Sequence, residues 1–442
     1  MSLSPGVPEP SDSPADRSAG GAGGLEHPLP AGMRDFLPTE ARRQAALVRR
    51  VIASFELFGY ERVSVPAFEY AEVLEKGLGA LEPEDVLRFV EPETGQVVAL
   101  RPDMTPQIAR LTATRLGRAP GPARLCYEGS VLRRRRERAR RHRQIPQAGI
   151  ELVGLAAPEG DLEVLEVASA AVRAAGLGEF VVDLGHTGVA SALLAGAAPP
   201  ARAVLVEALS LKDGATLVRQ AERAGLARDE VRALAALPEL HGGVEVWERA
   251  LAALSATPAA AASAELHALY RAADSLGLAP RLTVDLGEPR GFAYYTGVTF
   301  QLLAAGPGQP VGSGGRYDGL LARFGAPRPA AGFGLDLDNL AWALAHAGVA
   351  APPPPRVLVS GEGALPLLAA LRARGLACAP APSGADAEGY ASAWSFSYRL
   401  ALDGAGARLL SNGRGEWVEL TAASPAELAT RVAERIEHEA RR

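Results

Sequence analysis

Apolar residues recur at helical spacing near the start of the chain. From Thr39 to about Phe58 the residues with this spacing are Ala45, Leu47, Val48, Val51, Ile52, Phe55 and Leu57. Thr39 and Glu40 are typical of a helix start, and Gly59 is typical of a helix end. The pattern predicts an amphipathic helix over residues 39–58.

Alternating apolar and polar residues then predict strands. They are "YERVSVPAFEY", "VVALRPDMT", "ARLCYEGSVL" and "QAGIELVGL". The last two flank an arginine-rich stretch with no helix between them, so we expect them to pair antiparallel. Helices rich in Ala and Leu are expected at 158–176 and about 189–280, with the strand "EFVVDLGHTG" between them. Strand-like "LTVDLG", "YTGVTFQLL" and "GFGLDL" follow.

"GSGGRYDGL", residues 312–320, lies among these later strands. It predicts a glycine-rich hairpin, because Gly314 and Gly315 permit close approach of another backbone.

The length of 442 residues exceeds the roughly 250 to 300 that one core supports, so we expect several domains. Residues 1–26, rich in Gly, Pro and Ser, are expected to be a disordered tail. A core domain over 27–350, with the helical insertion at about 189–280, would be followed by a proline-rich linker at 351–355. Alternating strand and helix patterns predict a small C-terminal α/β domain over 356–442.

Composition narrows the class of protein. Lys and Arg total 46 against 51 for Asp and Glu, a net charge of -5, so the chain as a whole is no polyanion binder, although eight arginines crowd residues 133–143. The two cysteines, which lie far apart, are too few for a disulfide scaffold or a zinc site, and no histidines have metal spacing. No stretch suits a signal peptide or a membrane span. We expect a cytoplasmic protein with no metal and no cofactor.

The segment "LRPDMT" carries the first candidate binding residues. Arg101, Asp103 and Thr105 stand two apart and are expected to face one side of a strand end. A carboxylate and a hydroxyl on one face suit an ammonium group, although a solvated strand terminus explains this motif equally well.

The segment "QAGIE" carries a second pair. Gln147 and Glu151 share a face of a strand because their spacing is even, and both are expected to be buried beside apolar neighbours. Buried polar side chains need partners, which a small polar ligand would supply.

Two further segments carry chemistry. In "RGFAYYTGVTF", Arg290 suits a carboxylate, and a hydroxyl of Tyr294 or Tyr295 suits a ring nitrogen, although paired tyrosines are more often core residues. "GFGLDLDNL" predicts a strand that turns into a helix, whose N-terminus would attract a phosphate if Asp336 and Asp338 did not repel it.

Over roughly residues 27–345 the chain resembles the class II histidyl-tRNA synthetases, because it carries six of their motifs in the same order. These are "GMRDFLP", "LRPDMT", "YEGSVLR…QAGIE", "RGFAYYTG", "GGRYDGL" and "GFGLDLDNL". The resemblance implies an α+β fold in which an antiparallel sheet with flanking helices carries the site. It also implies that the helix at 39–58 builds a dimer interface. The C-terminal domain resembles a worn anticodon-binding domain.

The resemblance also implies a histidine pocket. Asp103, one methylene shorter than the family's glutamate, and Thr105 would hold the α-amino group with Gln147 beside them. Glu151, Tyr294 and Tyr295 would serve the imidazole, and Arg290 the carboxylate side. Arg133 matches the arginine after the first strand of the second class II motif, which holds ATP in active synthetases, and it completes the predicted ligand-binding set. No catalytic residue is predicted.

The parts that hold ATP in that family depart from its pattern. Arg135 stands where the family has a glutamate, Asn339 where it has the arginine of the third motif, and Pro146 where it usually has a histidine. The turn at 332–340 is therefore interpreted as a former ATP clamp.

With the markers "DLGH" at 183–186 and "LPELHGG" at 237–243, the chain resembles the regulatory subunits of ATP phosphoribosyltransferase, the glycosyltransferase that begins histidine biosynthesis. That resemblance implies a non-catalytic homodimer inside a hetero-octamer with short-form catalytic subunits, and histidine feedback.

Two alternatives stay open. An active histidyl-tRNA synthetase is favoured by the arginine-rich segment and the C-terminal domain, but disfavoured by Asn339, Arg135, Pro146 and the acidic net charge, so tRNA is not an expected partner. The other alternative is a paralogue for another small amino acid or partner.

Overall fold

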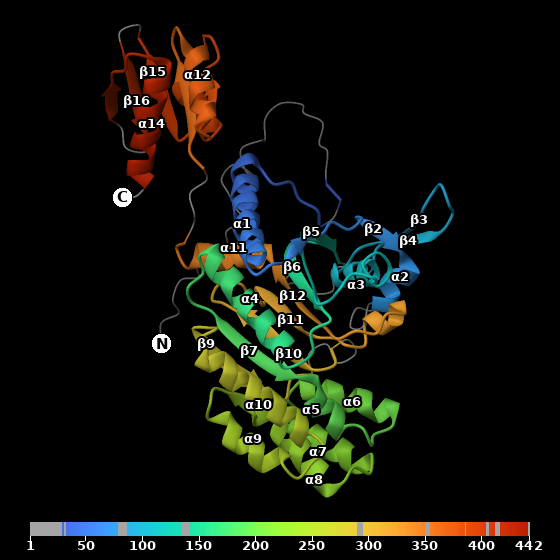
Figure 1. Ribbon diagram of the computed structural model, residues 1–442. Helices are drawn as coiled ribbons and strands as arrows, with labels where there is room; N and C mark the ends of the chain where they lie inside the picture. The colour runs from blue at the N-terminus through green and yellow to red at the C-terminus, as the bar shows by residue number, and fades with distance from the viewer. Residues whose placement is uncertain are drawn as a thin grey trace.

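A nine-stranded sheet organises the larger part of the molecule (Figure 1). The computed structural model describes residues 29–30, 32–77, 86–133, 142–289, 295–349, 354–384, 386–403, 406–411 and 416–440. The strands lie in the order β1 (Glu61–Arg62), β5 (Ala123–Leu132), β6 (Gln144–Val153), β12 (Ala330–Asp336), β11 (Gly312–Arg316), β10 (Val298–Leu303), β7 (Val181–His186), β9 (Arg281–Asp285) and β8 (His241–Gly242). Neighbours are antiparallel except β1 with β5 and β7 with β9. The predicted α+β class and the antiparallel pairing of β5 with β6 are confirmed.

The two faces of this sheet differ in chemistry. One cross-strand row is almost wholly apolar and runs through Cys126, Ile150, Phe333, Gly314, Phe300 and Leu184. The next row, on the opposite face, is polar or glycine and runs through Tyr127, Gly149, Gly334, Ser313, Gln301 and Asp183. Since alternate residues of a strand point to opposite faces, the same strands build a core on one side and a polar floor on the other.

Four helices cover the apolar face: α1 (Pro38–Leu57), α4 (Glu159–Ala175), α10 (Ala260–Ser275) and α11 (Leu337–His346). Helix α1 runs as predicted to within a residue, with a proline at its first position and a left-handed glycine, Gly59 (φ 80°), just beyond its end. Phe55 of α1 meets Phe333 edge to face at 5.6 Å between ring centres. The amphipathic pattern at 39–58 thus marks the face that packs on the sheet.

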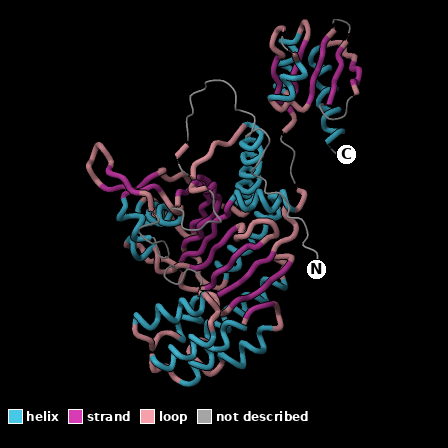
Figure 2. The backbone as a smooth tube through the Cα atoms, turned by 180° about the vertical axis from the view of Figure 1, so that it is seen from behind, coloured by secondary structure: helices cyan, strands magenta, loops and turns pink. Residues whose placement is uncertain are grey.

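A group of helices fills the stretch between β7 and β9 (Figure 2). It comprises α5 (Thr187–Leu193), α6 (Pro199–Ser210), α7 (Gly214–Arg223), α8 (Arg228–Ala236), a 3-10 turn at Leu237–Glu239, α9 (Val246–Leu254) and α10. We call residues 187–280 the insertion. Its apolar residues merge with the core of the large sheet.

Two predicted elements differ from the structure. "YERVSVPAFEY" forms only the two-residue β1 and the separate β2 (Phe68–Tyr70), because the backbone around Pro66 turns its carbonyl groups toward the side chain of Arg101. "GSGGRYDGL" is not a hairpin but begins with the central strand β11. Its glycines do serve close approach, since a β-carbon on Gly314 would lie 2.4 Å from the carbonyl oxygen of Gly332.

Smaller elements complete the core domain. Strands β2, β4 (Val97–Leu100) and β3 (Arg88–Val90) form a three-stranded sheet beside α2 (Ala71–Gly77) and α3 (Thr105–Thr114), and a 3-10 turn spans Leu321–Phe324. The predicted tail, residues 1–26, and residues 351–353 of the predicted linker lie outside the described residues.

A second sheet forms the C-terminal unit, which both views show apart from the large sheet (Figures 1 and 2). Its strands are β14 (Ala377–Pro380), β13 (Arg356–Ser360), β15 (Tyr398–Leu402), β16 (Ala407–Ser411) and β17 (Trp417–Leu420), and its helices are α12 (Ala364–Ala373), α13 (Ala387–Ala393) and α14 (Pro425–Ala440). Strand β16 and helix α14 have no counterpart among the predicted elements. The unit has an apolar core of its own.

Candidate functional site

The centre of the candidate site is the carboxyl group of Glu151, which is almost fully buried on the polar floor. Thr105 donates a hydrogen bond to Glu151 Oε1 at 2.6 Å, and the hydroxyl of Tyr317 donates to Oε2. Burial raises the pKa of Glu151 well above its ordinary value; the hydrogen bond from Thr105 opposes this, and the nearby Asp103 adds to it. Burial therefore favours the protonated form of this carboxyl.

Aromatic hydroxyls surround this carboxyl. Burial raises the pKa of the buried Tyr127, as do Glu151 and Asp103, while a hydrogen bond with Thr105 lowers it. Burial, Asp103 and Glu151 also raise the pKa of Tyr295. The rings of Tyr295 and Tyr317 lie 6.3 Å apart between centres. The raised pKa values keep Tyr127 and Tyr295 as neutral hydrogen-bonding groups beside the carboxyls of Glu151 and Asp103.

Asp103 and Thr105 reach the site from a turn and not from a strand end as predicted. Strand β4 ends at Leu100, and α3 begins at Thr105. Asp103 Oδ1 accepts from the backbone N–H of Met104 at 2.7 Å, which fixes the turn. Arg101 points elsewhere: it donates to the carbonyls of Val65 and Ser130 and is therefore structural. A strand-to-helix turn breaks the two-residue alternation, which is why the prediction failed.

Arg133 and Gln147 line a cavity of about 170 Å³ on the same face, with Gln301, Ser313 and Asp336. Arg133 donates to the carbonyl of Pro102 at 2.7 Å and so lies next to the turn that holds Asp103. Gln147 is half-buried where burial was predicted, yet its Oε1 is shielded from solvent with no hydrogen-bond partner among the described atoms. An acceptor in that state is suited to a ligand that brings an N–H donor.

Glycines in the strands leave room for the polar side chains of the site. A β-carbon on Gly332 would lie 2.6 Å from Glu151 Oε2, and one on Gly149 would lie 2.5 Å from the hydroxyl of Tyr127. One on Gly315 would lie 2.9 Å from the ring of Tyr295. Only glycine at these positions leaves the polar side chains their places, so the strands are shaped around the site.

The start of α11 lies next to the cavity that Arg133 and Gln147 line, and its backbone N–H groups already have side-chain partners. Asp336 Oδ1 accepts from the backbone N–H groups of Asp338 and Asn339, each at 3.1 Å. Arg34 contacts Asp338 at 2.5 Å, and Asn339 donates to the carbonyl of Pro310 at 2.9 Å. Burial and Asp336 raise the pKa of Asp338, and Arg34 opposes them. A phosphate would meet carboxylates here in place of free N–H groups.

The structure brings together six of the eight predicted ligand-binding residues: Asp103, Thr105, Arg133, Gln147, Glu151 and Tyr295. Arg290 and Tyr294 lie outside the described residues, as does Arg135. Tyr127 and Tyr317 were not predicted. The pairing of β5 with β6 places Tyr127 opposite Gly149, so its position between Gln147 and Glu151 was available from the strand alternation.

Comparison of the sequence with known proteins shows the family to which the chain belongs. Residues 32–340 match the family model described as histidyl-tRNA synthetase. A regulatory subunit of ATP phosphoribosyltransferase from an Anaeromyxobacter species is 47% identical over 337 residues, which are 75% of this chain and 97% of that one. The chain belongs to the family of ATP phosphoribosyltransferase regulatory subunits.

Solved structures agree on the fold. A Bacillus halodurans protein titled as an ATP phosphoribosyltransferase regulatory subunit/histidyl-tRNA synthetase is 30% identical, with a TM-score of 0.73 over 84% of this chain and 97% of its own. Histidyl-tRNA synthetase from Nostoc sp. PCC 7120, 22% identical, has a TM-score of 0.75 over 93% and 100% and shows the fold alone. As a member of this regulatory-subunit family, the chain has its part in histidine biosynthesis, and the class II synthetase-like architecture is confirmed. No helix in the described ranges has the length and apolar character to cross a membrane.

Proposed function

We propose that this regulatory subunit binds free histidine around Glu151 and conveys feedback to a short-form catalytic subunit of ATP phosphoribosyltransferase, without catalysis of its own. The observation that carries the proposal is the buried carboxyl of Glu151, held by Thr105 and Tyr317 on a floor of glycines. A costly buried carboxyl is typical of a site that recognises a ligand.

The chemistry of histidine suits the groups that surround Glu151. An imidazole N–H finds an acceptor in that carboxyl, and a tyrosine hydroxyl suits the other ring nitrogen. Asp103 places a carboxylate for the α-ammonium group, and Arg133 and Arg290 supply guanidinium groups for the carboxylate. Gln147, whose shielded Oε1 has no partner among the described atoms, suits a further N–H of the ligand.

Feedback requires histidine to bind two states of the complex unequally, because a ligand with equal affinity for both shifts neither. Coupling of about 1 to 3 kcal/mol, which is typical of allosteric proteins, would make the affinity for histidine differ by roughly 5- to 150-fold between the two states. In our proposal the complex with bound histidine is the less active state.

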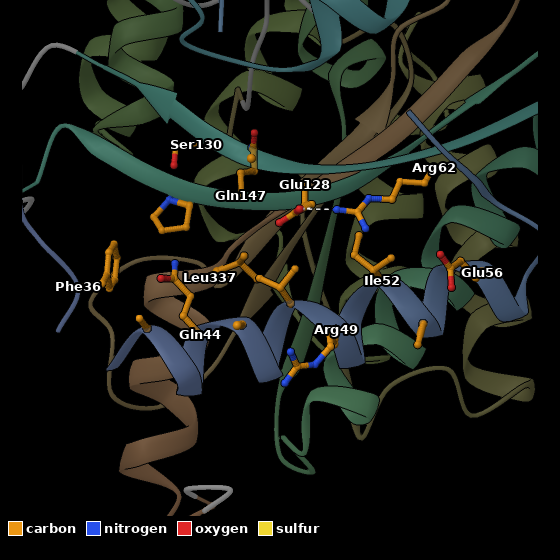
Figure 3. Close-up of a pocket in the computed structure, with 16 residues that line it drawn as sticks. Phe36, Gln44, Arg49, Ile52, Glu56, Arg62, Glu128, Ser130, Gln147 and Leu337 are labelled. Carbon is orange, nitrogen blue, oxygen red and sulfur yellow. Dashed lines mark hydrogen bonds and ion pairs between the residues drawn. The ribbon is translucent and has the colours of Figure 1, made fainter. Parts of the chain in front are cut away.

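Assembly is proposed to use α1. A groove of about 800 Å³ lies between α1 and strands β5 and β6, with Gln44, Val48 and Ile52 on the helix side (Figure 3). Arg62 and Glu128 pair across its far wall. We propose that a second copy of the chain covers this groove in a homodimer, which joins catalytic subunits in a cytoplasmic hetero-octamer.

The first experiment is calorimetric titration of the purified protein with histidine, run beside histidine-dependent ATP–pyrophosphate exchange. We expect binding without exchange, followed by co-purification of the short-form transferase. Absence of histidine binding would refute the proposal. Robust exchange would identify a synthetase in its place, with Arg133 and other groups holding ATP despite the closed start of α11.

A further inference from the structure

One buried arginine lies on the opposite side of the sheet from the pocket, and the proposed function does not use it. Arg316, the last residue of β11, is 3% exposed. It shares the apolar face with Gly314, because alternate residues of a strand point to the same side. Tyr317, the next residue, reaches Glu151 on the polar floor. A charged side chain on the apolar face is costly unless its partners compensate it.

The partner of Arg316 is Asp161, which is equally buried in the first turn of α4. Nε of Arg316 donates to Asp161 Oδ1 at 2.7 Å. A β-carbon on Gly160 would lie 2.8 Å from Nη2 of Arg316, so glycine lets the helix approach the guanidinium. Burial raises the pKa of Asp161 to about 6 and Arg316 opposes this, so the pair is ionised at neutral pH. Helix α4 therefore packs on the end of β11 through a buried ion pair.

A second nitrogen of the guanidinium joins the ends of neighbouring strands. Nη1 of Arg316 donates to the carbonyl of Leu155, just beyond β6, at 3.3 Å. It also contacts Asp318 Oδ1 at 3.0 Å. The same carboxylate oxygen accepts from the backbone N–H of Ala330, the first residue of β12, at 2.9 Å. Arg316 thus connects the ends of β11, of β12 and of β6, the strand that carries Glu151.

The residues that lead into β10 are held at the same place. The backbone N–H of Thr296 donates to the carbonyl of Arg316 at 2.7 Å, and its hydroxyl accepts from the N–H of Asp318 at 2.9 Å. A β-carbon on Gly297 would lie 3.2 Å from Cδ of Arg316, so the chain passes close to the arginine side chain. Tyr295, whose ring lies in the pocket, directly precedes Thr296.

These contacts fix positions more than they add stability. Nη2 of Arg316 is shielded from solvent and has no hydrogen-bond partner among the described atoms. An unused buried donor costs free energy, and a buried ion pair often adds little net stability. What the contacts do supply is a fixed geometry, since the segments that carry Tyr295 and Tyr317 both meet at this arginine.

We propose that Arg316 is a positioning residue for histidine binding. Held by Asp161, it sets where the hydroxyls of Tyr295 and Tyr317 lie in the pocket. The proposal rests on the proposed function for its ligand, but the contacts themselves belong to the free chain.

The test uses the full-length chain, with histidine affinity measured by calorimetry. Arg316→Lys keeps the charge, but a single nitrogen replaces the fork that reaches Asp161 and Asp318 separately. Arg316→Met combined with Asp161→Asn removes both charges, so no buried carboxylate is left unpaired. Tyr317→Phe, alone and added to Arg316→Lys, completes a double-mutant cycle.

Amide hydrogen exchange is measured on the same proteins. The N–H groups of Thr296 and Ala330 report on the two segments that Arg316 and its partner Asp318 hold. Arg124→Met is the control, because it breaks a pair with Glu163 of the same helix α4 but outside the pocket. It should match wild type in histidine affinity and in the exchange of peptides covering 295–300 and 328–333.

We expect both Arg316 variants to bind histidine about tenfold more weakly and to exchange about tenfold faster in those two peptides, with α1 unchanged. Adding Tyr317→Phe to Arg316→Lys should weaken binding by less than about twofold more, because the hydroxyl is already misplaced. Wild-type affinity in either Arg316 variant would overturn the proposal. Independent, multiplying effects in the cycle would also overturn it, and so would faster exchange throughout the chain. If the wild type bound no histidine, the proposed function would fail, while the exchange of the two peptides would still test the positioning.

Discussion

The two ends of the polar floor are built from the same strands but have opposite chemistry. Around Glu151, hydroxyl groups converge on a carboxyl that a ligand can share. At the start of α11, each polar group is engaged within the protein: Asp336 caps the helix, Asp338 pairs with Arg34 and Asn339 binds the carbonyl of Pro310. The comparison teaches that one set of strands can hold a polar pocket open to a ligand at one end and a helix start whose polar groups are taken up within the protein at the other.

Replacing Glu151 by Gln should have the largest effect on this comparison. The amide keeps the shape but cannot ionise toward a bound histidine, and loss of a charge-assisted hydrogen bond of about 2 to 3 kcal/mol in the complex predicts roughly 30- to 150-fold weaker histidine binding. Calorimetry measures this directly. Glu163→Gln is the control, because Glu163 is a partly buried carboxylate that, like Glu151, accepts from a tyrosine; it also accepts from an arginine and lies outside the pocket. Equal affinity in wild type and Glu151→Gln would remove Glu151 from the site.

The same variant tests how the raised pKa of Glu151 affects the stability of the protein without ligand. Because the pKa of Glu151 is raised in the folded protein, its contribution to stability is fully present below about pH 4.5 and is lost as pH rises through the raised value. Glutamine does not titrate, so Glu151→Gln should gain stability relative to wild type as pH increases. Melting temperatures of the two proteins across pH 4 to 9 test this. A constant difference would mean that Glu151 is ionised without cost.

The hydroxyls around Glu151 should give the next largest effect. Thr105→Val and Tyr317→Phe each remove one hydrogen bond to the carboxyl, and a contribution of about 1 to 1.5 kcal/mol predicts about 5- to 12-fold weaker histidine binding. The double variant should lose less than the product of the two, because both act on one group. Thr283→Val, which removes a hydroxyl bonded to Asp183 farther along the same face, should bind histidine normally.

The sequence predicts which residues surround Glu151 better than it predicts the elements from which they reach it. Even spacing on β6 places Gln147 and Glu151 on one face, since a strand fixes side-chain direction locally. The turn between β4 and α3 defeats the same argument for Arg101, because its direction depends on the distant carbonyls of Val65 and Ser130.

Contacts far apart in sequence explain the other differences. Tyr317 lies 166 residues from Glu151, and Arg34 lies 304 residues from Asp338, so no local pattern connects either pair. Strand β11 was predicted as a hairpin because its glycines fit a turn as well as they fit a crowded sheet. The sequence therefore supplies the chemical groups, while the sheet decides which of them meet.

The smallest effect is expected at the start of α11, from Asn339→Arg, which introduces the arginine that the synthetase motif has at this position. We expect no ATP binding and no ATP–pyrophosphate exchange, because Asp336 already binds the N–H groups of residues 338 and 339 and its carboxylate lines the cavity. Loss of the bond to Pro310 should cost about 1 kcal/mol, a fall of roughly 2 to 4 °C in melting temperature.

Asn339→Ala separates the two effects of Asn339→Arg, which are the lost hydrogen bond to Pro310 and the added positive charge. It should melt at the same lowered temperature and should likewise bind no ATP, because it loses the same bond to Pro310 without gaining a charge. ATP binding by Asn339→Arg alone would show that a single missing cation, and not the closed cap of α11, distinguishes the two ends. ATP binding that needs Asp336→Ser as well would locate the block in the cap, because serine is a shorter, uncharged capping residue. The carboxylate of Asp336 would then be the group that keeps phosphate away.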